Sequence, residues 1–235
     1  MTLRVATMAR MSSTASNRAA RRWPVITASV AIGVTILLGL LIVSRDTALS
    51  LDREWMEELL EERGPWWDVP ALFLDWIGGH VVGIIVVPLV MVIWLAALRR
   101  PWAAGYSLGA AAVSAGVVQL LKALFDRARP EFMLVASDEG SFPSGHVANA
   151  ATIAVVLALI FGLGEDRRRW VWVAGGAYVV AMALSRTYLG VHWLTDTIGG
   201  LLVGVAIAVI LWAPIAHRLA AEPRPVRERA DAPQI

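Results

Sequence analysis

The sequence predicts an all-α, polytopic membrane protein built as a bundle of six transmembrane helices. Of its 235 residues, 57% are hydrophobic and 17% are charged, whereas about 25% of the residues in a typical soluble domain are charged. The apolar residues form six long runs, and about 20 such residues are needed to cross a bilayer as a helix. The chain has no cysteine, which excludes disulfides and thiolate metal sites.

The six apolar runs give the expected spans in order. They cover residues 25–43, 81–98, 102–121, 147–163, 171–189 and 198–215. Pro88 lacks a backbone donor, so we expect a kink in the second span. The third span has Gly105 and Gly109 four residues apart, and the sixth has Gly200 and Gly204 at the same spacing. Such pairs allow close helix contact within a bundle or between chains, so the oligomeric state stays open.

Residues 47–63 differ from the spans because they mix acidic and apolar side chains. Six carboxylates occupy much of the helical surface, and the apolar side chains share one face: Leu51, Trp55, Met56, Leu59 and Leu60. Ser50 is suited to cap the start, and Gly64 with Pro65 to end the helix. The pattern predicts an amphipathic extracytoplasmic helix between the first and second spans.

The charge distribution predicts the orientation in the membrane. Six spans place both termini on one side, and most of the arginines lie in the segments on that side. By the positive-inside rule that side is cytoplasmic. We therefore expect a disordered basic cytoplasmic tail at residues 1–23, a membrane domain at residues 24–218 and a polar cytoplasmic tail at residues 219–235.

Three segments with chemically active side chains fall at the extracytoplasmic ends of the expected spans. They are KALFDRARP at 122–130, SFPSGH at 141–146 and SRTYLGVHWLTD at 185–196. The first and third supply the cations Lys122, Arg129 and Arg186, which could surround phosphate oxygens. Ser144 and Gly145, at the start of a helix, offer a hydroxyl and backbone N–H groups to an anion.

The same segments contain two histidines and an aspartate. His192 and Asp196 are four residues apart, so in a helix they share one face. A carboxylate on one imidazole nitrogen orients the ring and leaves the other nitrogen free to attack or to accept a proton. His146 could act as a proton donor. His80, at the outer start of the second span, is expected to be an interfacial residue.

Each segment also has a simpler interpretation. Lys122 and Arg129 could be interfacial cations paired with nearby acids, PSGH could be a turn with a helix cap, and His192 with Asp196 could be a capped helix start. All three simpler interpretations would have to hold at one end of the bundle, which favours a phosphate site.

The spacing of these residues resembles the three-part signature of the type 2 phosphatidic acid phosphatase (PAP2) superfamily. Lys122 is followed after six residues by Arg129 and Pro130, and PSGH occupies 143–146. Ser185 and Arg186 are followed after five residues by His192 and after three more by Asp196. All eleven signature residues are present, and the resemblance extends to the six-span layout.

The resemblance implies a role for each of these residues. His192 would attack phosphorus and form a phosphohistidine while Asp196 orients it. His146 would protonate the leaving lipid oxygen and then activate water. Lys122, Arg129, Arg186, Ser144 and Gly145 would hold the phosphoryl oxygens. Neither a metal nor another cofactor is expected.

We therefore expect a metal-independent phosphatase in the inner membrane, acting at the extracytoplasmic face on a lipid phosphate or diphosphate. Polyprenyl diphosphate, phosphatidylglycerophosphate and phosphatidate are all open as substrates, and no nucleic-acid partner is expected. A lipid-phosphate phosphotransferase of the same family and a non-catalytic lipid-binding or transport protein are the alternatives.

Overall fold

The computed structural model describes residues 2–45, 48–137, 140–161 and 165–223, and every regular element in these ranges is helical. This confirms the all-α prediction. The helices, in order, are α1 (Thr2–Val43), α2 (Ser50–Glu61), α3 (Pro65–Gly78), the π-helix η1 (His80–Val86), α4 (Val87–Ala97), α5 (Pro101–Phe125), α6 (Gly145–Phe161), α7 (Glu165–Tyr188) and α8 (Leu194–Ala221).

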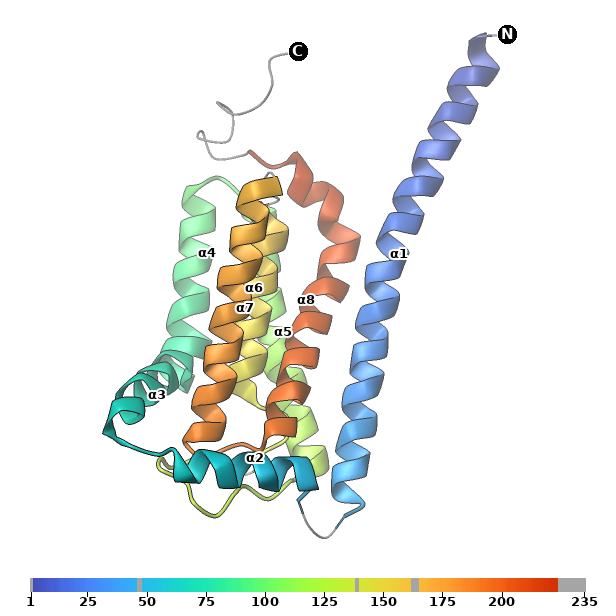
Figure 1. Cartoon of the computed structure of the whole chain (residues 1–235). Helices are drawn as coiled ribbons and strands as arrows, with labels where there is room; N and C mark the ends of the chain where they lie inside the picture. The colour runs from blue at the N-terminus through green and yellow to red at the C-terminus, as the bar shows by residue number, and fades with distance from the viewer. Residues whose placement is uncertain (1, 46–47, 138–139, 162–164, 224–235) are drawn as a thin grey trace.

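The long helices run side by side as a bundle with α6 at its centre (Figure 1). α6 packs against α5, α7 and α8, while α1 lies along the outer side of α8. Four described helical stretches are long and apolar enough to cross a membrane: Arg22–Val43, His80–Ala97, Pro101–Phe125 and Leu194–Ala221. These four match the predicted first, second, third and sixth spans, so the chain is a multi-pass membrane protein. The count of six spans stays a prediction.

Small residues let α6 and α8 approach closely. A Cβ atom at Gly204 would lie 2.9 Å from the Cβ of Ala151, and a Cβ at Gly200 would meet the carbonyl oxygen of Ser144. The predicted pair in the sixth span therefore serves a contact within the bundle. A Cβ at Gly105 or Gly109 would meet nothing within 4 Å, so the pair in the third span makes no such contact. The α6–α8 contact also fixes the start of α6 beside the start of α8.

The first helix is longer than the sequence predicts. α1 begins at Thr2, so it includes the basic segment for which the composition predicts disorder. Residues 2–22 contain no glycine or proline, and α1 continues into them past Pro24, which lies inside the helix. At the other end of the chain, α8 ends at Ala221, and residues 224–235 of the predicted polar tail lie outside the described residues.

The predicted second span is broken near its start. The π-helix η1 runs to Val86, and Pro88 follows in the first turn of α4. Proline cannot donate to the carbonyl four residues earlier, which favours a wider turn before it. α3 precedes this break and was not predicted. It begins at Pro65, which suits the first helical position, and Trp66 and Trp67 are exposed on it.

The helix predicted at residues 47–63 is α2, which lies across the end of the bundle where α7 ends and α8 begins (Figure 1). Its buried residues are Met56 and Asp52, whereas Leu51 is exposed. The face that contacts the bundle therefore contains a carboxylate from the predicted polar face. The buried carboxylate of Asp52 contacts Thr195 in the first turn of α8.

Candidate active site

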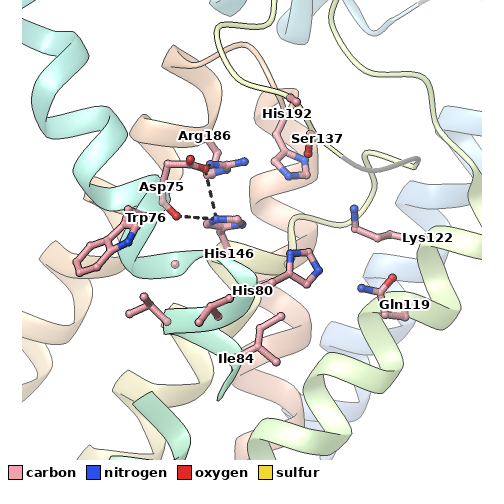
Figure 2. A pocket seen from close by; sticks show the side chains of 16 residues that line it. Asp75, Trp76, His80, Ile84, Gln119, Lys122, Ser137, His146, Arg186 and His192 are labelled. Atoms are coloured by element: carbon pink, nitrogen blue, oxygen red, sulfur yellow. Dashed lines mark hydrogen bonds and ion pairs between the residues drawn. The ribbon is translucent and has the colours of Figure 1, made fainter. Parts of the chain in front are cut away.

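The three predicted segments meet at one end of the bundle, around a cavity of about 910 Å³. Five of the eight predicted site residues line the cavity: Lys122, Gly145, His146, Arg186 and His192. Figure 2 shows the side chains of Lys122, His146, Arg186 and His192 around one space. Arg129, Ser144 and Asp196 lie behind this lining, where they contact the segments that form it.

His192 and Asp196 are paired as the sequence predicts. His192 Nδ1 lies 3.4 Å from Asp196 Oδ2, and both side chains are buried. Burial lowers the pKa of His192 to about 4, and Asp196 acts in the opposite direction. The imidazole is therefore neutral at physiological pH, which leaves one ring nitrogen with a lone pair.

Asp196 is held from three sides. Its Oδ2 accepts a hydrogen bond from the backbone N–H of Trp193 at 2.8 Å, as an acid in the first helical turn can do. Its Oδ1 accepts from Arg127 Nη1 at 2.5 Å, and its backbone oxygen accepts from the N–H of Ser144 at 2.9 Å. The last bond ties the PSGH segment directly to α8.

Two of the three predicted cations fix the loops around the cavity. Lys122 Nζ donates to the carbonyl oxygen of Gly140 at 2.6 Å, and Arg129 Nη2 donates to the same oxygen at 3.1 Å. Arg129 Nη1 also donates to the carbonyl of Val191, next to His192. Arg129 therefore joins the 122–130 and 185–196 segments and places positive charge behind His192.

Arg186 and His146 share a partner that sequence reasoning missed. Asp75 of α3 forms an ion pair with Arg186, and its Oδ1 lies 3.6 Å from His146 Nε2 (Figure 2). His146 Nε2 also lies 3.2 Å from the backbone oxygen of Asp75. The only signal in the sequence is one acid within the apolar stretch 69–79, which does not name a partner.

The His146 ring packs directly on α3. A Cβ atom added at Gly78 would lie 2.5 Å from His146 Cδ2 and 3.0 Å from Met182 Cε. Met182 is fully buried, so it fills the space beside the ring on the same side of α3. Gly78 therefore leaves the space that this position of the ring requires.

Ser144 lies just before the first residue of α6 and does not line the cavity. Its side chain is fully buried, and among the described residues its hydroxyl has no hydrogen-bond partner. Its backbone holds the start of α6 against α8, while Gly145 lines the cavity. A direct contact from the Ser144 hydroxyl to phosphate stays a prediction.

The cavity changes from charged to apolar away from His192. His80 and Gln119 lie between the other two histidines of the cavity and Ile84 (Figure 2). His80, expected at the membrane interface, thus lines the cavity. A smaller cavity of about 40 Å³ shares Ile84, Gln119 and Gly145 with the first and continues along Pro88 and Ala111. A small, mostly apolar cavity therefore adjoins the site between η1, α4, α5 and α6.

Among the described residues, no group of three or more His, Cys, Asp or Glu side chains could hold a metal ion. The positive charge around the cavity comes from the side chains Lys122, Arg129 and Arg186. Such an arrangement can bind an anion between fixed cations, with a neutral imidazole from His192 on one side and His146 on another.

The fold and the site together define an all-helical, multi-pass membrane protein with a cavity at one end of its bundle that is lined by histidines and cationic side chains. The family model of the PAP2 superfamily matches residues 100–218, and the chain belongs to that superfamily.

Two curated relatives and one solved structure are similar to the chain. It is 38% identical over 94 residues to phosphatidylglycerophosphatase B of Bacillus subtilis, covering 38% of this chain and 46% of the relative. It is 34% identical over 87 residues to an undecaprenyl-diphosphatase of Sulfolobus acidocaldarius, covering 37% and 39%. The chain thus spans less than half the length of either relative. The crystal structure of a PAP2-type phosphatidylglycerolphosphate phosphatase from Bacillus subtilis superposes with a TM-score of 0.71 at 23% identity, over 79% of this chain and 94% of the other.

Proposed function

We propose that the chain is a metal-independent phosphatase that hydrolyses a lipid phosphate or diphosphate through a phosphohistidine intermediate. The observation that carries this proposal is the pairing of a buried, neutral His192 with Asp196 beside a cavity that is also lined by His146 and two cations. A protein that only binds lipid phosphate needs the cations but gains nothing from an oriented nucleophile.

The first chemical step forms the phosphohistidine. The free nitrogen of His192 attacks phosphorus, and the bond from phosphorus to the lipid oxygen breaks. His146, in its protonated form, gives its proton to that oxygen, so the lipid leaves as a neutral hydroxyl or as a phosphate group. Asp196 stabilises the positive charge that develops on the imidazole of His192.

The second step releases phosphate. Water attacks phosphorus, His146 accepts a proton from it, and the bond between phosphorus and His192 breaks. Lys122, Arg129 and Arg186 stabilise the charge on the phosphoryl oxygens in both steps. Since Arg186 is paired with Asp75, a bound phosphate would exchange with that carboxylate.

The shape of the site supports a lipid substrate. The main cavity is lined on its η1 side by the apolar residues Val81, Val82 and Ile84, which suits a chain that stays in the bilayer while the phosphate reaches His192. In our proposed topology, six spans place both ends of the bundle domain in the cytoplasm and the site at the extracytoplasmic face of the inner membrane. The first turn of α1 and the last turn of α8 lie at the end of the bundle away from α2 (Figure 1), which agrees with this topology.

The names of the relatives indicate which lipids to try first. They are named for phosphatidylglycerophosphate and for undecaprenyl diphosphate, and both compounds combine a phosphate with a long apolar chain. We propose these two and phosphatidate as candidate substrates.

The proposal is tested by phosphate release from the purified protein in detergent. The panel contains a polyprenyl diphosphate, phosphatidylglycerophosphate and phosphatidate, each assayed with EDTA present and alongside His192→Ala. Release that survives EDTA and disappears in His192→Ala is the expected result. Release that requires added metal, or that persists in His192→Ala, would refute the route. Transfer of phosphate to an added acceptor alcohol instead of water would identify a phosphotransferase.

A further inference from the structure

A buried charge cluster joins α2 to the reactive pair. It contains Asp52 of α2, Arg127 of the loop after α5, and Thr195 and Asp196 of α8. Arg127 Nη1 lies 2.5 Å from Asp196 Oδ1, and Nη2 lies 2.6 Å from Asp52 Oδ2. Both carboxylates are fully buried, and the Arg127 side chain is 6% exposed. One guanidinium therefore bridges two carboxylates out of contact with water.

Asp52 also holds the first turn of α8. Its Oδ1 accepts from the backbone N–H of Thr195 at 2.9 Å, and its Oδ2 accepts from the Thr195 hydroxyl at 2.7 Å. Arg127 lies over the ring of Trp193, whose Nε1 donates to the carbonyl of Ala128 at 2.9 Å. Neither Asp52 nor Arg127 lines the cavity, so neither contacts a substrate phosphate there.

The charges of the cluster have a direct consequence for His192. Asp52, Arg127 and Asp196 together carry one net negative charge, and of the two carboxylates Asp196 is the one paired with His192. Positive charge develops on the imidazole as it bonds to phosphorus, so a net negative partner lowers the barrier. If Asp52 were neutral, Arg127 would compensate Asp196 alone, and the pair behind His192 would have no net charge.

We propose that Asp52 and Arg127 are positioning residues for phosphoryl transfer. Arg127 fixes the Asp196 carboxylate, and Asp52 neutralises Arg127 so that the negative charge of Asp196 remains available to His192. This inference rests on the phosphatase function proposed above. It assigns a chemical role to α2, a helix outside the segment that matches the family model.

Three variants test the charge balance: Asp52→Asn, Arg127→Gln and the double variant. Asp52→Asn leaves the cluster neutral, and Arg127→Gln leaves two buried carboxylates with no cation between them. We expect each single variant to lower kcat about tenfold or more with KM little changed, because the phosphate-binding cations are intact. Asp52→Asn acts by removing the net negative charge, and Arg127→Gln acts by removing the donor that fixes Asp196 beside a second, unpaired carboxylate. The double variant removes that unpaired carboxylate, so its kcat should exceed that of Arg127→Gln.

The pH profile gives a second readout. The charged and titratable groups that face His192 are Asp196 of α8, Arg186 of α7, Arg129 of the preceding loop and His146 of α6, and none is altered in these variants. Asp52→Asn should move the acidic limb of kcat/KM to lower pH, and Arg127→Gln should move it to higher pH, by about one unit each. A merely structural role gives no opposite shifts.

Arg63→Gln is the matched control. Arg63 follows α2 and donates from Nε and Nη2 to the carbonyl of Tyr188 at 3.1 and 2.9 Å, so it also ties this region to the bundle but does not touch Asp196. It should leave kcat and the pH profile unchanged. A double variant no more active than Arg127→Gln, or an equal loss of kcat in Arg63→Gln, would overturn the inference. If the wild-type protein released no phosphate, that result would instead count against the proposed function.

Discussion

Gly78→Ala should reduce catalysis strongly while leaving the bundle folded. The added Cβ would stand 2.5 Å from His146 Cδ2, whereas carbon atoms in contact prefer about 3.5 to 4 Å. The ring would therefore have to move by about 1 Å. A displacement of this size can lower a rate by about 100-fold, and overpacking costs about 1–3 kcal/mol of stability.

The measurements are kcat on the best lipid substrate and a melting curve from tryptophan fluorescence in detergent. A burst of nitrophenol from p-nitrophenyl phosphate separates the two steps, because this leaving group needs no proton. The loss in the burst rate should be smaller than the loss on the lipid, since His146 acts as an acid only for the lipid. Gly109→Ala is the control, because a Cβ there meets nothing within 4 Å. Full activity in Gly78→Ala with an unchanged melting curve would refute the placement of His146 against α3.

Three further predictions concern single groups at the site. Asp75→Asn removes a competitor for Arg186, so inorganic phosphate should inhibit about fivefold more tightly, as expected for a partly exposed ion pair of about 1 kcal/mol; an unchanged inhibition constant would contradict this. Because the pKa of His192 is lowered to about 4, the nucleophile becomes neutral as pH rises through that value. The acidic limb of kcat/KM should therefore lie near pH 4; an acidic limb near 6.5 would contradict the buried state of His192. Ser144→Ala should lower kcat/KM by less than about tenfold, because the hydroxyl does not line the cavity; a loss as large as that of Arg186→Ala would restore the phosphate contact predicted from the sequence.

The sequence predicts the parts of the site that follow from local spacing. His192 and Asp196 are one helical turn apart, so their pairing depends only on the start of α8. The helical segments were also predictable, since runs of about 20 apolar residues have few alternatives. The close contact at Gly204 had a signal in its spacing to Gly200, although the same signal at Gly105 and Gly109 leads to no such contact.

The partners that adjust the charges could not be predicted. Asp75 reaches Arg186 across 111 residues, and Asp52 reaches Arg127 across 75. Nothing local distinguishes Asp52 from the other acids of α2, and its burial depends on how α2 lies across the bundle. Arg127 lies within the predicted 122–130 segment, but phosphate binding was assigned to Lys122 and Arg129 of the same segment. The partners of Arg127 lie on other helices.

The chemical groups and their counter-charges come from different parts of the chain. The two histidines and the three cations lie within residues 100–218, which match the family model. Asp52 and Asp75 lie before that segment, on α2 and α3. Each pairs with an arginine that the matched segment supplies, Asp52 with Arg127 next to Asp196 and Asp75 with Arg186 next to His146. Two PAP2 proteins with the same signature could therefore differ in rate and pH dependence through helices that the signature does not include. Exchanging α2 and α3 between them should transfer those properties without changing any signature residue.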